Sequence, residues 1–514
     1  MKVNVPFDQA VLAFPEAENA LKAWRGRDLK GNDVDWRLHW YQWLPRSAVS
    51  NLVEDIVKST DLTGPELIFE RREWERTGPY SWQPGWADRV DMLPLEDFFG
   101  KRKFKPIKKY WDRAVQRVRD LIPGGSLHRL SIDEAAEQLP RSSSSGLPFF
   151  RKYRVVFDKE VARAKALDRG EIELEPFVAG WRGQPGGPEM TDVKQRLIWM
   201  SVQAEAIVSK TYMEPVQAAL SSRLEFAAWK DLASVGTAMY ELFTRARGRE
   251  IVSTDYEAYD STIPAQVLET VFDLLEYWHA ETSPGFEAIK EHFIYGDLLT
   301  PDGLLTGREG GVPSGAGVTQ GGGSIANMLF SVYAAECMQV EWLGGTFLGD
   351  DAVNVYSRFS VNEIVDCLSD VNLRQNEEKQ YVDSEAIHYL SSVWSKIRSV
   401  GRDIPGVRPL HRVANGMMSV ERFRNPKEFT RAVEAVGQIM KMENAIHHPG
   451  FQKFVAFARE GDEFLRKNPN RLLNRAGGVA GIEEVLGLAA FRYTSRDPER
   501  FNEFETVKLL REAL

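Results

Sequence analysis

The middle of this chain carries three short polar motifs in a fixed order, and their succession constrains its fold more than any other feature. One motif alone says little, because a chain of 514 residues at average amino-acid usage contains a Gly-Asp-Asp by chance roughly one time in ten. The set is therefore what carries information. The motifs are Asp255-x4-Asp260, Ser314-Gly315-x3-Thr319 and Gly349-Asp350-Asp351.

The first motif lies where a predicted β-strand ends. Residues 251–254 are a short β-prone run, and Asp255 follows them at a position from which a side chain can point into a cleft. Asp260 lies in the turn before a helix that is expected to open near Pro264. Each carboxylate is either a helix cap or a metal ligand, and the residues alone leave both interpretations open.

The second motif belongs to a glycine-rich segment, residues 310–327. Its glycines permit close backbone approach and positive φ angles, and the apolar run that follows predicts a helix packed beneath the loop. A flexible surface loop is the alternative. The spaced polar residues Ser314, Thr319 and Asn327 weigh against it, because the segment around them becomes strongly apolar.

Two apolar arms flank the third motif, which predicts a β-hairpin over residues 346–356 with Gly349, Asp350 and Asp351 at its tip. Adjacent acids at a hairpin tip are usually solvated turn residues. A metal-binding role becomes the better interpretation here because Asp255 supplies another strand-end acid. Mg²⁺ is commonly held by one or two carboxylates together with substrate phosphates.

Charge is unevenly distributed along the chain. The net charge of -9 argues against a nucleic-acid partner only if the sum is considered alone. Residues 101–119 are strongly basic and contain Phe104, Tyr110 and Trp111. This tract is either a solvated helix face or a wall that follows a nucleic-acid backbone with stacking aromatics. Its basic residues are Lys101, Arg102, Lys103, Lys105, Lys108, Lys109, Arg113, Arg117 and Arg119.

Length and composition predict a mixed α/β protein of about three subdomains with an extensive core, since 43% of its residues are apolar. Helices are expected over residues 193–212 and 238–247 and through most of the chain after 427. Cys337 and Cys367 are too few for a disulfide framework or a zinc site and are expected in the core, which favours a reducing compartment. No secretory leader or membrane-spanning run is recognised, so a soluble protein is expected.

At these motifs the chain resembles the RNA-dependent RNA polymerases of RNA viruses. Those of small double-stranded RNA viruses match best, the picobirnavirus type first and partitivirus-like enzymes second. The resemblance implies an α/β (α+β) closed right hand of fingers, palm and thumb, in which helices flank an antiparallel palm sheet. It places an N-terminal wrapping segment and fingers in residues 1–250, the palm in 251–400 with a fingers insertion near 265–305, and a helical thumb in 401–514.

The resemblance also implies roles for individual residues. Asp255, Asp350 and Asp351 would hold two Mg²⁺ or Mn²⁺ ions, and Lys379 would protonate the leaving pyrophosphate. Residues 389–394 match the position of a primer-gripping hairpin. The implied NTP-binding residues are Arg182, Lys194, Arg196, Asp260, Ser314, Thr319 and Asn327, and the implied template-binding residues are Ser144, Ser145 and Gly146.

One position departs from the pattern of many positive-strand relatives, which carry an Asn four residues after the motif Thr. Here Gly323 occupies that position, and Asn327 follows one helical turn later. Among the candidates for reading the sugar, Asp260 and Ser314 therefore rank above Asn327.

The implied activity is template-directed, two-metal nucleotidyl transfer for transcription and replication of a viral double-stranded RNA genome. The expected partners are RNA template and product, NTPs and a viral capsid protein. The enzyme is expected to be a monomer without membrane association, in the virion interior and the host cytoplasm. A reverse transcriptase shares the palm acids but typically has a bulky aromatic residue where Asp260 stands, and a non-catalytic RNA-binding or capsid-associated protein would explain the basic tract but not the acids.

Overall fold

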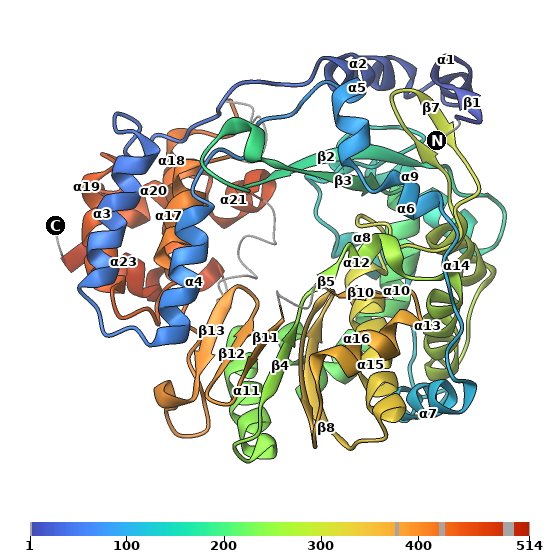
Figure 1. Cartoon of the computed structure of the whole chain (residues 1–514). Helices are drawn as coiled ribbons and strands as arrows, with labels where there is room; N and C mark the ends of the chain where they lie inside the picture. Colours follow the sequence, from blue (N-terminus) through green and yellow to red (C-terminus); the bar gives the residue numbers. More distant parts are fainter. Residues whose placement is uncertain (1–2, 376–379, 421–426, 487–497, 513–514) are drawn as a thin grey trace.

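Three groups of elements are arranged around the middle of the molecule (Figure 1). One β-sheet with its helices, the predicted palm, lies at the bottom of this view, a second sheet lies at the top, and helices from both halves of the chain lie together at the left. The computed structural model describes residues 3–375, 380–420, 427–486 and 498–512. The mixture of sheets and helices confirms the predicted α/β class.

The palm sheet is antiparallel, and its side chains alternate between two faces as the strand period of two requires. Its strands follow the order β11 (Tyr381–Asp383), β4 (Ile251–Thr254), β9 (Asp351–Tyr356) and β8 (Trp342–Leu348). Val252 and Tyr356 share a core with helix α15 (Thr319–Met338). Ile251 and Val353 share another core with helix α11 (Leu232–Ala246) on the opposite face.

The predicted hairpin over residues 346–356 is confirmed. Strands β8 and β9 pair in antiparallel fashion, and Leu348 lies opposite Asp351. Gly349 and Asp350 therefore form a two-residue turn. Such a turn needs a positive φ at its first central residue, and Gly349 supplies it with a φ of 61°.

The second sheet joins segments that are far apart in the sequence. Its strands follow the order β1 (Val5–Pro6), β7 (Gly303–Leu305), β6 (Leu298–Leu299), β2 (Phe177–Gln184) and β3 (Lys194–Met200). Strands β2 and β6 pair in parallel, and the other pairs are antiparallel. The sheet thus ties the start of the chain and residues 298–305 to the long β2–β3 ribbon.

The predicted helix over residues 193–212 is wrong in its first half. Residues 194–200 form strand β3, and helix α10 (Gln203–Leu220) begins only after it. Leu197 and Trp199 are buried, whereas Lys194 and Arg196 are exposed, which is the period-two pattern of a strand paired with β2. The helix predicted over residues 238–247 is confirmed within α11, which ends one residue earlier.

The helices at the left of Figure 1 come from two distant parts of the chain. They are α3 (Arg46–Lys58), α4 (Gly64–Glu75), α17 (Leu410–Met418), α18 (Arg431–Glu443), α19 (Phe451–Glu460), α20 (Pro469–Arg475), α21 (Gly478–Leu486) and α23 (Glu505–Glu512). Trp40 and Val53 share one hydrophobic core with Phe454 and Leu510. The helical pattern predicted after residue 427 is confirmed.

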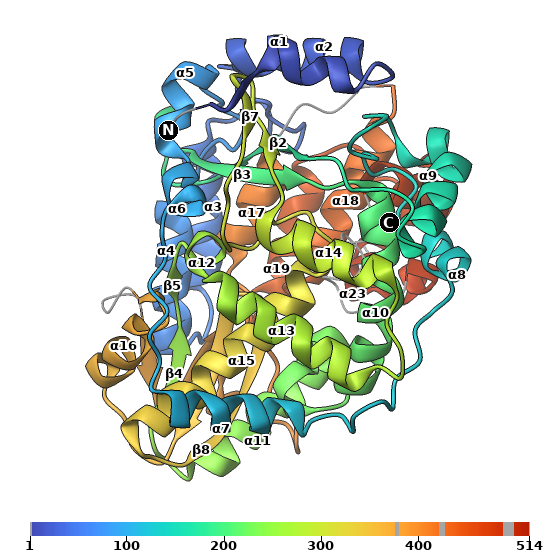
Figure 2. The same cartoon turned by 90° about the vertical axis from the view of Figure 1, so that its right-hand side faces the viewer.

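The basic tract ends in helix α7 (Lys108–Arg119), which crosses the helices α13 (Ala265–Trp278) and α15 (Figure 2). Its aromatic residues point inward: Trp111 is buried, with ring centroids 5.3 Å from Phe104 and 5.7 Å from Tyr333. Trp111 and Phe104 therefore belong to the core and do not form a stacking wall. The structure favours the interpretation of α7 as a solvated helix face.

Further helices surround the two sheets. Among the described residues, no helix is long and apolar enough to cross a lipid bilayer. The further helices around the two sheets are α1 (Phe7–Ala10), α2 (Glu18–Lys30), α5 (Trp86–Arg89), α6 (Leu95–Phe99), α8 (Ile132–Glu137), α9 (Tyr153–Asp168), α12 (Tyr259–Thr262), α14 (Pro284–Tyr295) and α16 (Val361–Ser369).

Candidate active site

Asp255 and the Asp350-Asp351 pair leave neighbouring strands at the same end of the palm sheet. Thr254, the last residue of β4, lies opposite Ala352 of β9, so Asp255 is placed beside Asp351. The pKa of Asp351 is raised to about 7, first by burial and then by the charges of Asp350 and Asp255. All three acidic residues are nevertheless exposed to solvent. The three carboxylates are therefore open to solvent, although the protein around them is dense enough to raise the pKa of Asp351.

The chemistry of these three carboxylates suits divalent cations. They are hard oxygen donors, and a bound cation would relieve the like-charge repulsion that contributes to the raised pKa of Asp351. Within the described ranges, no three His, Cys, Asp or Glu side chains converge into a preformed metal cage.

Helix α15 holds the turn that carries the acids. The Gly349 N–H donates to Ser324 Oγ at 2.8 Å, and Asn327 Nδ2 donates to the carbonyl oxygens of Gly349 and Asp350 at 2.9 and 3.1 Å. Asn327 Oδ1 accepts a hydrogen bond from the Tyr256 hydroxyl at 3.0 Å. Asn327 is fully buried. The structure therefore places this predicted NTP-binding residue beneath the acids, where it orients their turn.

Gln380, the residue before the neighbouring strand β11, holds the backbone of Asp255. Its Nε2 donates to the Asp255 carbonyl oxygen at 2.7 Å, and the Asp255 N–H donates to its Oε1 at 3.2 Å. Sequence reasoning did not find Gln380, because a single glutamine carries no recognisable motif. The adjacent predicted catalytic residue, Lys379, lies outside the described residues.

Asp260 lies on the one-turn helix α12, between the acids and the basic strand β3. Burial raises the pKa of Asp260 to about 7, the charge of Asp350 contributes to the rise, and the guanidinium of Arg196 opposes it. The Asp260 carbonyl oxygen accepts a hydrogen bond from the Val312 N–H at 2.6 Å. Asp260 is thus within electrostatic reach of both the acids and β3.

The glycine-rich segment is confirmed as a loop that leads into a helix, since α15 begins at Thr319. Ser314 Oγ accepts a hydrogen bond from the Trp199 N–H at 3.2 Å, and Thr319 Oγ1 donates to the Pro313 carbonyl oxygen at 2.5 Å. Gly315 has no room for a side chain, because a Cβ there would lie 2.0 Å from the Trp199 carbonyl oxygen. The loop therefore runs against the end of β3.

The three basic members of the predicted NTP-binding set lie on the β2–β3 ribbon. Arg182 lies opposite Arg196, and both are exposed, as is Lys194. A cavity of about 530 Å³ is lined by Lys194, Arg196 and Ala258, the last of which lies two residues before Asp260. The other lining residues are Met92, Thr191, Asp192, Val193 and Gln195.

The fold and these motifs agree with a comparison to known families. Residues 112–412 match the model of the viral RNA-dependent RNA polymerase family, which is more than half of the chain. The chain belongs to this family. It is therefore an RNA-directed RNA polymerase, a nucleotidyltransferase, and the activity predicted from the motifs is confirmed at this level.

Individual relatives of the polymerase agree with the predicted resemblance. It is 24% identical over 477 residues to a potential RNA-dependent RNA polymerase of human picobirnavirus, which covers 86% of this chain and 85% of the relative. It is 25% identical over 296 residues to the RNA-directed RNA polymerase of Cryptosporidium parvum virus 1, or 53% of this chain and 55% of the relative. The picobirnavirus type is thus confirmed as a match.

A solved structure shares the fold of the polymerase over its whole length. The crystal structure of the RNA-dependent RNA polymerase of a human picobirnavirus superposes with a TM-score of 0.84 at 20% identity and covers 100% of both chains. An insertion-loop deletion mutant of a human picobirnavirus polymerase superposes with a TM-score of 0.81 at 20% identity, covering 96% of this chain and 97% of the other. The predicted right-hand polymerase fold is confirmed.

The predicted template-binding residues of the polymerase divide into surface and interior positions. Ser144 is exposed, and its Oγ accepts a hydrogen bond from the Gly146 N–H at 3.3 Å. Ser145 is fully buried, and its N–H donates to the Arg151 carbonyl oxygen at 2.7 Å. Gly146 has a φ of 61°, and a Cβ there would lie 2.1 Å from the Ser201 carbonyl oxygen. Ser145 and Gly146 shape the turn that presents Ser144.

Residues 389–394 form the turn and flanks of the predicted hairpin, between β12 (Ala386–Tyr389) and β13 (Ser392–Ser395). Helix α4 covers this hairpin, because the rings of Phe69 and His388 stack with centroids 3.8 Å apart.

Arg412 on α17 lowers the pKa of Asp351, although burial and the neighbouring acids raise it more strongly. The C-terminal helices therefore bring a positive charge toward the acids, at a residue that no sequence motif marks.

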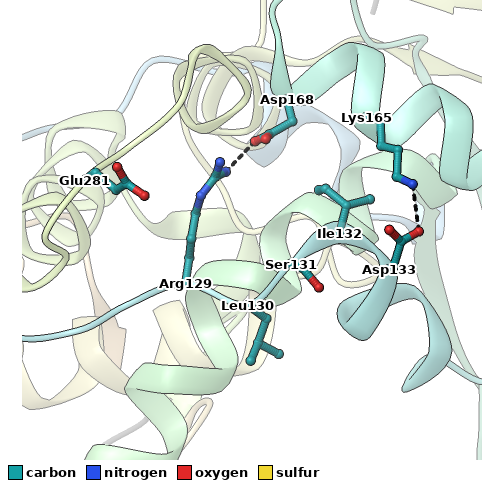
Figure 3. A pocket seen from close by; sticks show the side chains of 8 residues that line it. All are labelled: Arg129, Leu130, Ser131, Ile132, Asp133, Lys165, Asp168 and Glu281. Atoms are coloured by element: carbon teal, nitrogen blue, oxygen red, sulfur yellow. Dashed lines mark hydrogen bonds and ion pairs between the residues drawn. The ribbon is translucent and has the colours of Figure 1, made fainter.

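Figure 3 shows the residues that line a second cavity, of about 420 Å³. Ion pairs close two of its sides, Arg129 with Asp168 at 2.6 Å and Lys165 with Asp133 at 2.8 Å. Four of its charged lining residues are thus paired with one another, and Glu281 adds a further negative charge. None of the residues that sequence reasoning selected lines it.

Proposed function

We propose that the polymerase extends RNA by template-directed nucleotidyl transfer with two divalent ions and that it transcribes and replicates a viral double-stranded RNA genome. One observation carries the proposal. Acids from two neighbouring palm strands meet at one end of the sheet, and Arg196 of β3 lies close enough to lower the pKa of Asp260 beside them. Metal-binding and phosphate-binding candidates thereby lie on two sides of one site.

Asp255, Asp350 and Asp351 would hold the Mg²⁺ or Mn²⁺ ions. When bound, such ions stabilise both the attacking 3′-hydroxyl oxygen and the leaving phosphate oxygen. The chain keeps these carboxylates together despite their repulsion, because Asn327 holds the turn and Gln380 holds the end of β4. Ligands fixed in this way need little rearrangement during the reaction.

The basic residues of the ribbon, Arg182, Lys194 and Arg196, would neutralise the triphosphate. Their contribution is electrostatic, and it is greatest where protein surrounds the charges and excludes water. Lys379 would protonate the leaving pyrophosphate, and exposed Ser144 would contact the template strand. The hairpin of residues 389–394 would hold the primer or the growing product strand.

Asp260 and Ser314 would hydrogen-bond the 2′-hydroxyl, the group that distinguishes RNA from DNA. A carboxyl group whose pKa is about 7 is present in both protonation states near neutral pH, so Asp260 can donate to or accept from that hydroxyl. Thr319 would act by closing the loop that carries Ser314, and Asn327 by supporting the floor of the site.

The genome role sets the partners and the location. We infer that RNA template, RNA product and NTPs bind the polymerase, that a viral capsid protein accompanies it, and that it works as a monomer in the virion interior and the host cytoplasm. The location follows from the proposed activity, because a double-stranded genome must be copied where its strands and nucleotides are together, and the capsid protein and the monomeric state follow from the resemblance alone.

A primer-free assay on single- and double-stranded RNA templates, with Mg²⁺ or Mn²⁺ and labelled NTPs, tests the proposal. Asp350→Ala is expected to reduce synthesis at least about a hundredfold while RNA binding stays largely intact. Glu341→Ala is the matched control, because this exposed acid precedes β8 at the opposite end of the same hairpin. Unchanged synthesis by Asp350→Ala would reject the metal site, and strong preference for dNTPs would indicate a reverse transcriptase.

A further inference from the structure

Arg102 belongs to the basic tract, but its side chain turns into the protein. Burial lowers the pKa of Arg102 to about 10, so the group keeps its charge at neutral pH. Within the described ranges, no carboxylate lies within 4 Å of its guanidinium, and the N–H donors point instead at backbone carbonyl groups. The charged guanidinium of Arg102 therefore binds backbone carbonyl groups.

The guanidinium of Arg102 joins three separate segments. Its Nη2 donates to the carbonyl oxygens of Asp97 and Phe98 at 2.7 and 3.0 Å, at the end of α6. Its Nε and Nη2 donate to the Ser261 carbonyl oxygen in α12 at 3.0 and 2.9 Å. Its Nη1 donates to the Glu309 carbonyl oxygen at 2.7 Å, just before the glycine-rich loop.

Arg308 holds the next two residues of the same stretch of backbone. Its Nη1 donates to the carbonyl oxygens of Gly310 and Gly311 at 3.2 and 2.9 Å. Its Nη2 donates to those of His292 and Phe293 in α14, both at 2.9 Å. Burial and the nearby charge of Arg102 lower the pKa of Arg308 to about 9.

The clamped backbone connects the two residues proposed to read the sugar. The Gly311 N–H donates to the Ile263 carbonyl oxygen at 2.8 Å, and the Val312 N–H donates to that of Asp260 at 2.6 Å. Ser314 follows Val312 after one residue. The spacing between the Asp260 carboxyl group and Ser314 Oγ therefore depends on this clamp.

We propose that Arg102, together with Arg308, is a positioning residue that sets the spacing between Asp260 and Ser314 and thereby the discrimination between ribonucleotides and deoxyribonucleotides. The proposal rests on the proposed role of Asp260 and Ser314 in contacting the 2′-hydroxyl. Arginine suits the task because its planar fork carries five N–H donors that reach several acceptors at once. Lysine presents three donors from one atom and cannot span the same carbonyl groups.

Single-nucleotide incorporation on one RNA template, with an NTP and the matching 2′-deoxy NTP, measures the effect. Arg102→Lys and Arg308→Lys are each expected to lower kcat/KM for the NTP about tenfold or more and to leave the value for the dNTP nearly unchanged. The ratio of the two values is independent of how much enzyme is folded. Arg113→Lys is the matched control, because this arginine of the same tract pairs with Glu336 on the exposed face of α7.

Gly311→Ala approaches the same clamp without removing either arginine. Gly311 has a φ of 73°, and a Cβ there would lie 2.6 Å from Phe98 and 3.1 Å from Arg102 Nη2. This variant is expected to lower the NTP-to-dNTP ratio in the same direction. An unchanged ratio in all three variants, with Asp260→Ala losing discrimination, would overturn the positioning role alone. A wild-type enzyme that does not prefer NTPs would instead overturn the proposed role of Asp260.

Discussion

Glu160 on α9 is a carboxylate at a fully buried position outside the active site. Neither of its oxygens makes a hydrogen bond of normal geometry with the described part of the chain, and Arg163 Nε lies 3.7 Å away. Burial raises the pKa of Glu160 to about 8. The folded chain therefore keeps a proton on this group at pH values where the unfolded chain has released it.

That proton makes the free energy of unfolding depend on pH. Below about pH 4.5, the ordinary pKa of this group, both states are protonated; stability then falls as the pH rises toward 8. Glu160→Gln removes the titration. Its free energy of unfolding is therefore expected to be higher than that of the wild type by roughly 2–4 kcal/mol near pH 9 and to differ little from it near pH 4. Thermal unfolding across this range measures it, with exposed Glu171→Gln as control. A constant difference between variant and wild type would contradict the buried titration.

The placement of the metal-binding candidates was predictable because each one depends on local structure, although only the set of motifs pointed to a shared role. A strand end and a hairpin turn place Asp255 and Asp350 wherever the rest of the chain goes. The inward turn of Arg102 was not predictable, since its acceptors are carbonyl groups of residues more than a hundred positions away, such as Ser261 and Glu309. The same limit applied to Asn327, whose partners on the hairpin are set by the packing of α15.

At the scale of elements, the glycine-rich loop is held by the helix behind it. Glu205 on α10 is fully buried and accepts hydrogen bonds from Ser201 Oγ at 2.7 Å, Ser209 Oγ at 2.6 Å and the Gly317 N–H at 3.3 Å. Burial raises the pKa of Glu205, although these hydrogen bonds oppose the rise. One side chain thus connects the loop that carries Ser314 to α10.

Removing this connection is expected to loosen the loop. Glu205→Ala leaves the Gly317 N–H and two hydroxyl groups without their acceptor and is expected to lower kcat/KM for NTP incorporation about tenfold. Glu205→Gln keeps an acceptor in nearly the same place and is expected to retain most of the activity.

Glu214→Ala is the control on the same helix, since Glu214 pairs with Lys210 nearer the surface. Steady-state incorporation of one nucleotide gives the values. Equal activity of the Ala variant and the wild type would show that other contacts hold the loop.

Helices and strands were predictable where the apolar residues followed one spacing only, either that of a strand or that of a helix. The apolar arms of the 346–356 hairpin and the run after Thr319 gave the strands and helix that the structure contains. A helix was wrongly predicted for residues 194–200 because Leu197 and Trp199 also fit helical spacing with the apolar residues of α10. Pairing with β2 decided between the two periods, and a single sequence does not show which strand lies alongside.

At the scale of the whole molecule, the N-terminal segment completes a hydrophobic core made mostly by the last hundred residues. Trp40 is fully buried, its Nε1 donates to the Ala458 carbonyl oxygen at 3.0 Å, and its ring lies near those of Phe454 and Phe457. The resemblance implied an N-terminal wrapping segment but could not name its partner. Sequence patterns report which face of an element is apolar, whereas the partner is set by the path of the chain.

Trp40→Ala tests whether the two ends of the chain form one structural unit. The substitution leaves a large cavity and removes a hydrogen bond, so the free energy of unfolding is expected to fall by about 3–5 kcal/mol. Trp43→Ala is the matched control three residues later, because Trp43 is 66% exposed and its loss is expected to change stability by about 0.5 kcal/mol or less. Hydrogen exchange of α19 measures the effect where it should appear. Faster exchange of α19 in Trp40→Ala, with the palm strand β4 unaffected, would show that the N-terminal segment is part of the C-terminal core. Unchanged exchange of α19 would show that the two ends of the chain do not form one structural unit.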